Sequence, residues 1–327
     1  MKEPDLISAG STIMKDKYGR IIKYLRLSVT DLCNYRCIYC MPEEGVPKKN
    51  HSDILSIEEL SEIAEASYDL GITKIRLTGG EPLLRKGILT LCENIRRISD
   101  DIELSITTNG SLLPKMAKEL KSAGVDRLNI SLDTLDRDTF RRITRLGELD
   151  QTLEGIKAAQ SAGFDNIKIN TVLLGGVNDS EILPLMLLTK DNNIQLRFIE
   201  LMPIGITKSL SDNLFVTVEN IEKLLLNSAE LTVDGVARVY RLPGYKGSIG
   251  LISPMSHSFC ERCDKIRVTA DGRLKPCLHS EDEISLKGLH GNELIQAIKN
   301  GIINKPMCHN LDSVGSQSSR NMNEIGG

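Results

Sequence analysis

The sequence predicts an α/β fold built around a parallel β-sheet. Between residues 20 and 202, short runs rich in β-branched residues alternate with segments of helical periodicity. Glycines close several of the helical segments and mark where each helix ends and the next strand begins. Because each intervening helix returns the chain to the starting end of the sheet, strands connected in this way lie parallel.

Six runs are predicted to be the strands of this sheet, over residues 23–30, 73–80, 103–110, 127–134, 166–173 and 194–202. A helix is predicted over residues 56–71, because Ser56 and Glu59 have the spacing of a capping box and Gly71 suits the left-handed turn after a helix. The helices predicted over 115–124 and 152–163 also end in glycine.

Polar residues stand at the end of every predicted strand. They are Thr30-Asp31, Thr78-Gly79-Gly80-Glu81, Thr107-Thr108-Asn109, Ser131-Leu132-Asp133, Asn170 and Glu200. Any one of them is most simply a turn residue or a helix cap. Parallel strands bring their carboxyl ends to one edge, however, so the whole series predicts a functional site at that edge.

Length and charge disfavour several classes of function. The chain has 327 residues, enough for one large barrel or two domains, and its formal net charge is -3. This charge argues against a general nucleic-acid or membrane-surface role, so any phosphate binding needs locally gathered cations. The absence of tryptophan and an aromatic content of 4% also disfavour base-stacking surfaces.

The N-terminal residues contain no apolar run of signal-peptide length, and no stretch is long and apolar enough to cross a bilayer. We therefore expect a cytoplasmic protein without a membrane partner. In a reducing compartment, its eight cysteines are expected to be metal ligands, catalytic thiols or packing residues rather than disulfides.

The regular alternation of strands and helices ends after Met202-Pro203. This change predicts three parts: an N-terminal segment of residues 1–19, a sheet domain of residues 20–205 and a C-terminal domain of residues 206–327.

The first cysteine group, Cys33, Cys37 and Cys40, follows the first predicted strand as Cys-x3-Cys-x2-Cys. Structural zinc sites usually have four protein ligands, whereas three thiolates on one loop suit an iron–sulfur cluster in which one iron stays open. The nearest histidine, His51, is an alternative fourth ligand.

The second group, Cys260, Cys263 and Cys277, again has three members. A hairpin turn at Asp271-Gly272 is expected to return the third cysteine to the first two. A zinc site completed by His279, His257 or Cys308 is the alternative interpretation. Cys92 is expected to be a buried packing residue, and Cys308 either a packing residue or, beside His309, a ligand.

Cations on the predicted strands form a candidate anion pocket. The chain has no G-x-x-x-x-G-K-[ST] phosphate loop, but Arg26, Arg76, Lys168 and Arg197 alternate with apolar neighbours on four strands. Side chains in this pattern are expected to share one face, where guanidinium groups suit phosphate. Ion pairs with Asp31, Glu81 or Glu200 are the structural alternative.

The first cysteine loop, with Tyr39 before its last cysteine, and the turn Gly79-Gly80-Glu81-Pro82 resemble those of the radical S-adenosylmethionine superfamily. The resemblance implies a partial TIM-type (β/α)6 barrel of parallel strands over residues 20–205, with a C-terminal extension carrying a second iron–sulfur cluster. In that superfamily S-adenosylmethionine chelates the open iron of a [4Fe–4S] cluster. Reductive cleavage then yields a 5′-deoxyadenosyl radical.

The full set of motifs is similar to that of the GTP 3′,8-cyclase family, which performs the first step of molybdenum cofactor biosynthesis. They are TGGEPLLR, TTNG, SLD, RFIELMP, FCERC and the terminal IGG. This resemblance implies a lyase that converts GTP to 3′,8-cyclo-7,8-dihydro-GTP, with two [4Fe–4S] clusters and GTP bound at the second open iron. It also implies a low-potential electron donor of the ferredoxin or flavodoxin type, a downstream cyclic pyranopterin monophosphate synthase, and a monomer or homodimer.

The same resemblance assigns individual residues. It places Arg26, Arg76, Thr107, Lys168, Lys265 and Arg267 at GTP, Tyr39, Gly80, Ser131 and Met202 at S-adenosylmethionine, and the catalytic tail at Gly326 and Gly327. The chain departs from the family pattern at Leu32, where arginine is usual, and at Asp264-Lys265, where Asn-Arg is usual. Lysine keeps the positive charge but loses the bidentate fork.

Two other functions are compatible with the cysteine groups. The second cluster could be auxiliary in a radical enzyme that modifies peptides, or both groups could hold zinc or carry electrons in a non-catalytic protein. The nature of the bound metal and the identity of the substrate distinguish these alternatives.

Overall fold

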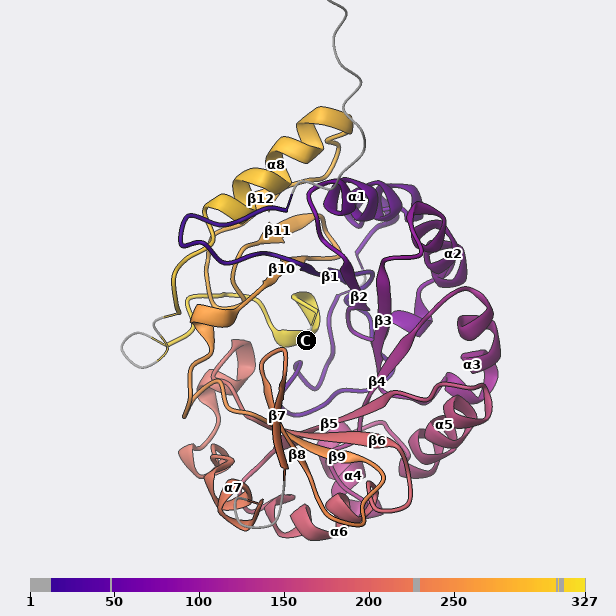
Figure 1. Cartoon of the computed structure of the whole chain (residues 1–327), viewed down its shortest axis with the longest axis vertical. Helices are drawn as coiled ribbons and strands as arrows, with labels where there is room; N and C mark the ends of the chain where they lie inside the picture. The colour runs from indigo at the N-terminus through magenta and orange to yellow at the C-terminus, as the bar shows by residue number, and fades with distance from the viewer. Residues whose placement is uncertain (1–12, 48, 226–229, 310, 312–314, 327) are drawn as a thin grey trace, which may run out of the picture.

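The computed structural model describes residues 13–47, 49–225, 230–309, 311 and 315–326. One twelve-stranded sheet, in the order β12-β11-β10-β1-β2-β3-β4-β5-β6-β9-β8-β7, organises this part of the chain. Figure 1 shows the sheet curving round a central space, with helices on its outer face and the C-terminal tail inside. The end strands β12 and β7 do not pair within the described residues, so the barrel is open.

Six neighbouring parallel strands form the middle of the sheet, as the sequence predicts. They are β1 (Tyr24–Ser28), β2 (Lys74–Thr78), β3 (Glu103–Thr108), β4 (Arg127–Ser131), β5 (Ile167–Leu173) and β6 (Ile194–Glu200). The partial (β/α)6 barrel is therefore confirmed.

The helices that cover this part of the sheet lie between its strands in the sequence. They are α1 (Ile57–Asp69), α2 (Ile88–Ile98), α3 (Leu113–Ser122), α4 (Arg137–Thr144), α5 (Leu149–Ser161) and α6 (Ile182–Leu187). The predicted capping box at the start of α1 is present, because Ser56 Oγ accepts from Glu59 N and Ser56 N donates to the Glu59 carboxylate. Gly71 has φ +85°, the left-handed conformation expected after this helix.

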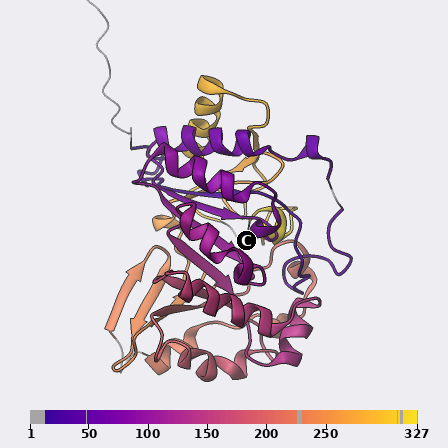
Figure 2. The same cartoon turned by 90° about the vertical axis from the view of Figure 1, so that its right-hand side faces the viewer.

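The C-terminal part of the chain extends the same sheet at both edges. Strand β9 (Ser248–Ile252) lies parallel to β6, and β10 (Lys265–Val268) lies parallel to β1. Beyond them lie β8 (Ala237–Arg241) and β7 (Glu230–Asp234) on one side, and β11 (Arg273–Lys275) and β12 (Ile284–Ser285) on the other. Figure 2 shows α8 (Gly291–Ile303) and the β7–β8 hairpin at opposite ends of the molecule. Helix α7 (Glu219–Leu225) precedes that hairpin in the sequence.

Strand register separates an apolar outer face from a polar inner face. Leu25, Leu27, Ile75 and Leu77 are fully buried in the main hydrophobic core. Arg26, which lies between the two leucines of β1, belongs to the opposite face, because successive strand residues point in opposite directions. The helices thus cover the apolar face, and the polar residues face the interior. No described helix is long and apolar enough to cross a membrane.

Gly155 allows α5 to pack closely on the loop before α3. A Cβ at this position would lie 2.1 Å from the carbonyl oxygen of Gly110, a backbone atom with little freedom to move. We expect Gly155→Ala to lower the free energy of unfolding by about 1–3 kcal/mol, because the methyl group overpacks this contact. In an unobstructed helix, the same change stabilises by about 1 kcal/mol.

Chemical denaturation of anaerobically purified protein measures this effect. Glu154→Ala, at an exposed neighbouring position of α5, is the control and should change the free energy of unfolding by less than about 0.5 kcal/mol. A stabilised Gly155→Ala variant would show that the two backbones do not approach as closely as described.

Candidate functional site

A cavity of about 380 Å³ lies inside the curved sheet. Both cysteine groups line it: Cys33, Cys37 and Cys40 of the first group, and Cys260, Cys263 and Cys277 of the second. All the residues predicted to bind ligands line it as well: Arg26, Arg76, Thr107, Lys168, Lys265, Arg267, Tyr39, Gly80, Ser131 and Met202. The fold therefore gathers into one cavity residues that are distant in the sequence.

The first cysteine group forms the loop that follows β1. Cys40 N donates to Cys37 O at 2.9 Å, and Ile38 N donates to Ile143 O at 2.9 Å, which ties the loop to α4. Burial raises the pKa of Cys33 to about 11 and that of Cys40 to about 12. Such thiols become thiolates when a bound metal supplies positive charge, so the loop suits a cationic centre.

The cysteine side chains are not arranged for a single metal ion. Within the described residues, no three His, Cys, Asp or Glu side chains converge closely enough to hold one. Zinc bonds sulfur at about 2.3 Å and requires such convergence, whereas a four-iron cluster binds each thiolate through a different iron. The side chain of His51, the alternative fourth ligand of the first group, lies outside the described part of the structure.

A hairpin brings the second cysteine group together, as predicted. Strands β10 and β11 pair antiparallel, with Arg267 opposite Lys275, and Gly272 in the turn has φ +79°. The hairpin returns Cys277 to the side of the cavity that Cys260 and Cys263 line.

Of the three alternative ligands considered for this second group, His279 lies at the cavity, whereas His257 and Cys308 are exposed and do not line it. The expectation that Cys308 is a buried packing residue is therefore wrong. Cys92, by contrast, is fully buried in α2, which confirms its packing role.

Two histidines lie beside the second cysteine group. The ring centroids of His279 and His309 are 4.8 Å apart, and burial lowers the pKa of His279 to about 3. Burial alone would raise the pKa of Cys260, but a hydrogen bond with His309 contributes to a net decrease to about 7. A thiol with this pKa is readily converted to a metal-binding thiolate.

Strand register aligns three arginines across the cavity wall. Arg26 on β1 is paired with Arg76 on β2 and with Arg267 on β10. Burial, together with the charges of Arg267 and Arg76, lowers the pKa of Arg26 well below its usual value. Cations gathered in a buried row repel one another, so the row favours an anionic partner.

Lys265, at the position where the family usually has arginine, is engaged locally. Its Nζ lies 2.8 Å from the Asp264 carboxylate and 5.3 Å from the centre of the Tyr24 ring. The Arg76 guanidinium approaches the same ring from 5.2 Å. Tyr24, which the sequence did not single out, thus positions two cations of the cavity wall.

The turn after β2 brings its backbone close to the first cysteine loop. A Cβ on Gly79 would lie 2.2 Å from Thr30 O, and one on Gly80 would lie 2.3 Å from Leu32 O. Glu81 holds the turn in place by accepting hydrogen bonds from Thr108 Oγ1 and Asn109 N, both at 2.8 Å. Because of burial, its pKa is raised to about 7.

Asp133 similarly fixes Tyr39, which precedes the last cysteine of the first loop. The Tyr39 hydroxyl donates to Asp133 Oδ2 at 2.6 Å, and Val172 N donates to Asp133 Oδ1 at 2.8 Å. Glu200 accepts from Val218 N, Met255 N and Ser256. Asp133 and Glu200 therefore organise the loops around the cavity.

The C-terminal tail enters the cavity and contacts both sides of it. Gly326 O accepts from Arg26 Nη2 at 2.9 Å and from Arg267 Nη1 at 2.7 Å. A backbone hydrogen bond from Asn323 acts to lower the pKa of Cys40, against the dominant effect of burial. Gly326 has φ +70°, and a Cβ there would lie 2.2 Å from Thr78 Oγ1, so glycine is required. Gly327 lies outside the described residues.

Arg320 anchors this tail to the β10–β11 hairpin and the following segment. Its guanidinium donates to both carboxylate oxygens of Asp271, at 3.1 and 3.0 Å, and of Glu283, at 2.7 and 2.8 Å. We expect Arg320→Ala to accelerate amide exchange in residues 321–326 by about tenfold or more, because charge-assisted hydrogen bonds of this kind contribute about 1.5–3 kcal/mol.

Hydrogen–deuterium exchange measured by mass spectrometry tests the anchor. Arg137→Ala removes an exposed arginine that pairs with Asp150 and should leave exchange in the tail unchanged. Equal exchange in the wild type and the Arg320→Ala variant would mean that other contacts hold the tail.

Several cavity residues were not identified from the sequence. They include Lys74, Arg127, Asp234 and Lys305. Lys168 and Arg197 both pair with Asp234, at 2.5 and 2.6 Å, and not with Asp31, Glu81 or Glu200, the predicted alternatives. Lys305 Nζ, although buried, donates to Lys265 O and Pro276 O, which lie in the sequence between Cys263 and Cys277. No local motif marks these positions.

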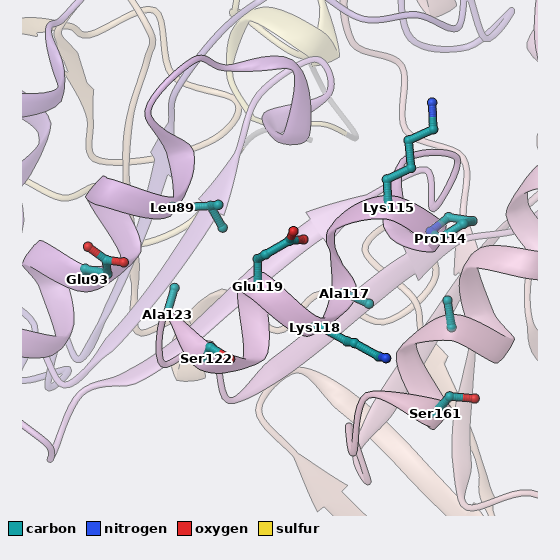
Figure 3. A pocket seen from close by; sticks show the side chains of 11 residues that line it. Leu89, Glu93, Pro114, Lys115, Ala117, Lys118, Glu119, Ser122, Ala123 and Ser161 are labelled. Carbon is teal, nitrogen blue, oxygen red and sulfur yellow. The ribbon is translucent and has the colours of Figure 1, made fainter.

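A second hollow, of about 590 Å³, lies on the outer layer among α2, α3 and α5. Figure 3 shows that Glu93, Lys115, Lys118 and Glu119 contribute charged side chains to its lining. It contains none of the predicted ligand-binding residues. The cavity inside the sheet is therefore the candidate active site.

Two family models match consecutive parts of the chain. The Radical SAM superfamily model matches residues 27–189, and the model described as Molybdenum Cofactor Synthesis C matches residues 194–311. The junction between the two matches lies near the predicted domain boundary at residue 205. The boundary itself stays a prediction, because strands that precede residue 205 and strands that follow it belong to one sheet.

Solved structures with a similar fold include Streptococcus suis SuiB bound to S-adenosylmethionine, with a TM-score of 0.58 and 14% identity, covering 94% of this chain and 77% of that one. Another is anSMEcpe with bound AdoMet, with a TM-score of 0.56 and 15% identity, covering 85% of this chain and 81% of that one. At these identities the likeness shows the fold alone.

Curated relatives match over nearly their whole length. GTP 3′,8-cyclase from Peptoclostridium acidaminophilum is 48% identical over 326 residues, which cover 97% of this chain and 99% of the relative. The enzyme of the same name from Petrotoga mobilis is 44% identical over 323 residues, covering 96% and 100%. Together with the two family models, these matches show that the chain belongs to the GTP 3′,8-cyclase family of the radical SAM superfamily.

Proposed function

We propose that this protein converts GTP to 3′,8-cyclo-7,8-dihydro-GTP in the first step of molybdenum cofactor biosynthesis. The observation that carries the proposal is the pairing of two three-cysteine groups across a single cavity lined by buried cations. One group is available for a radical-generating cluster and the other for a cluster that receives the substrate. The names of the relatives support the identity of that substrate.

The cysteines would hold two [4Fe–4S] clusters, the first on Cys33, Cys37 and Cys40 and the second on Cys260, Cys263 and Cys277. When bound, the first cluster and S-adenosylmethionine supply a 5′-deoxyadenosyl radical by one-electron cleavage of a carbon–sulfur bond. The chain itself would hold both ligands in one cavity, where exclusion of water would protect a reactive intermediate from side reactions.

For S-adenosylmethionine we assign Tyr39, Gly80, Ser131 and Met202. The close backbone approach at Gly80, where a Cβ would lie 2.3 Å from Leu32 O, supports a contact made through the main chain. The hydrogen bond of Tyr39 to Asp133 holds the tyrosine beside the first cysteine group. Met202 and Ser131 contribute an apolar and a polar surface.

For GTP we assign Arg26, Arg76, Thr107, Lys168, Lys265 and Arg267. Thr107 Oγ1 and Asn170 Oδ1 are buried in the cavity wall without a hydrogen-bond partner in the described structure. Buried polar atoms of this kind favour a polar ligand, and the cations favour one that is negatively charged. A nucleoside triphosphate meets both requirements.

The tail residues Gly326 and Gly327 are assigned an assisting role in catalysis. Gly326 supports this assignment, since its carbonyl oxygen accepts from Arg26 and Arg267, two of the cations assigned to GTP. The backbone there orients guanidinium groups that also face the substrate. Loss of the tail would therefore remove these two hydrogen bonds from Arg26 and Arg267.

The same assignment implies partners outside the chain. A low-potential donor of the ferredoxin or flavodoxin type would supply electrons, and a cyclic pyranopterin monophosphate synthase would consume the product. We infer a cytoplasmic location and a monomer or homodimer. The net charge of -3 agrees with a small-molecule substrate rather than nucleic acid.

An anaerobic assay of the reconstituted protein tests the proposed function. With reductant, S-adenosylmethionine and GTP, it should form 5′-deoxyadenosine and the cyclised nucleotide, identified by mass spectrometry. Cofactor cleavage with GTP returned unchanged would overturn the substrate. Turnover that requires a peptide would favour a peptide-modifying enzyme, and bound zinc without iron would overturn radical chemistry.

A further inference from the structure

Asp234, at the tip of the β7–β8 hairpin, occupies the cation cluster formed by β5 and β6. Its Oδ2 lies 2.5 Å from Lys168 Nζ and 2.6 Å from Arg197 Nη2, so one carboxylate oxygen bonds both cations. The side chains of Lys168 and Arg197 are each 8% exposed, whereas that of Asp234 is 42% exposed. The cations therefore belong to the cavity wall, and the carboxylate reaches them from its rim.

Lys168 and Arg197 are buried side by side, so their positive charges require a negatively charged partner. Burial and the charge of Arg197 lower the pKa of Lys168 to about 7, although Asp234 acts in the opposite direction. Burial alone would raise the pKa of Asp234, but the hydrogen bond from Lys168 and the charges of both cations lower it to about 2. The Asp234 carboxylate is thus ionised at neutral pH and compensates the pair.

The edge strand that carries Asp234 packs loosely, whereas its partner β8 has buried side chains and pairs with β9. Strand β7 is an edge strand that pairs with β8, and four of its five residues are exposed. The hydrophobic side chains of Leu231 and Val233 are 52% and 56% exposed, so they contribute little packing. Gly235, which follows Asp234, has φ +63°, and a Cβ there would meet no neighbouring atom within 4 Å. The described contacts that hold the tip in the cavity are chiefly its ion pairs.

We propose that Asp234 is a specificity-determining residue whose carboxylate competes with the phosphates of the substrate for Lys168 and Arg197. This inference rests on the proposed function, in which Lys168 binds GTP. A carboxylate and a polyphosphate repel each other when they share two cations, so the ligand displaces Asp234 toward solvent. A ligand without a phosphate chain leaves Asp234 in place and gains nothing from the two cations.

Calorimetric titration of the reconstituted holoenzyme with inorganic tripolyphosphate, in EDTA, tests this competition. Asp234→Asn should bind tripolyphosphate about tenfold more tightly than the wild type, because the competing charge-assisted bonds are weakened. Guanosine, which lacks phosphates, should bind both proteins equally. Asp234→Glu, which keeps the carboxylate, should stay close to the wild type.

The matched control is Asp150→Asn. It makes the same change of net charge at an exposed ion pair with Arg137, outside the cavity, and should leave tripolyphosphate binding unchanged. An equal gain in this control would attribute the effect to net charge and overturn the proposal. Unchanged or undetectable binding of tripolyphosphate by Asp234→Asn would overturn it as well.

Weaker binding by Asp234→Asn when Mg²⁺ is added would also contradict the proposal, because Asp234 would then bind the ligand through the metal. The test of this competition can succeed or fail independently of the test of the proposed function. A wild type that fails to cyclise GTP while Asp234→Asn still gains affinity for tripolyphosphate would refute the reaction and leave the competition standing.

Discussion

Cys37→Ala is expected to abolish cleavage of S-adenosylmethionine, with iron falling from about eight to about four atoms per chain. Cys37 is the middle cysteine of the loop after β1, and this loop supplies three of the thiols that line the cavity. With two thiols left, the first cluster has too few ligands. Both 5′-deoxyadenosine and the cyclised nucleotide should then be undetectable in the anaerobic assay.

Iron analysis and chromatography of the nucleosides measure the two effects. Cys92→Ala is the matched control, because Cys92 is fully buried in α2 and does not line the cavity. This variant should retain the iron content of the wild type. Cofactor cleavage by Cys37→Ala at the wild-type rate would show that the radical arises elsewhere.

Cys277→Ala is expected to separate the two activities. Cys277 belongs to the second cysteine group of the cavity, and its loss should remove the second cluster and lower the iron content to about four atoms per chain. Some 5′-deoxyadenosine should still form, because the first cysteine loop is intact. The cyclised nucleotide should be absent, since the substrate has lost its binding site.

Cys308→Ala is the control for this second variant. Cys308 is exposed and does not line the cavity, so both iron content and product formation should match those of the wild type. A loss of iron in Cys308→Ala would make Cys308 a protein ligand and would contradict an open second cluster. Equal loss of both activities in Cys277→Ala would show that the two centres are not separable.

Local features of the fold could be predicted because they depend on residues close together in the chain. The capping box of Ser56 and Glu59 spans four residues, and both of its hydrogen bonds are present. The turn at Asp271-Gly272 joins neighbouring strands, and glycine meets its need for a positive φ. The alternation of strands and helices likewise follows from side-chain periodicity.

The position of Asp234 could not be predicted, because its contacts join residues that are far apart in the chain. Asp234 is separated by 66 residues from Lys168 and by 37 from Arg197, and the contact depends on how β7 and β8 extend the sheet. Nothing in the local sequence distinguishes this aspartate from other hairpin residues. Its partners were expected to pair, if at all, with strand-end carboxylates instead.

The sequence by itself determined the family, the parallel strands and the cysteine, cation and glycine positions that can carry the chemistry. Only the tertiary structure decided that β10 pairs with β1, which sets Arg267 beside Arg26, and that the Gly326 carbonyl lies between these two guanidinium groups. Residue type and spacing are local properties of a chain. Register between distant strands depends on packing of the whole sheet, so the shape and charge of the cavity emerge only when that sheet is formed.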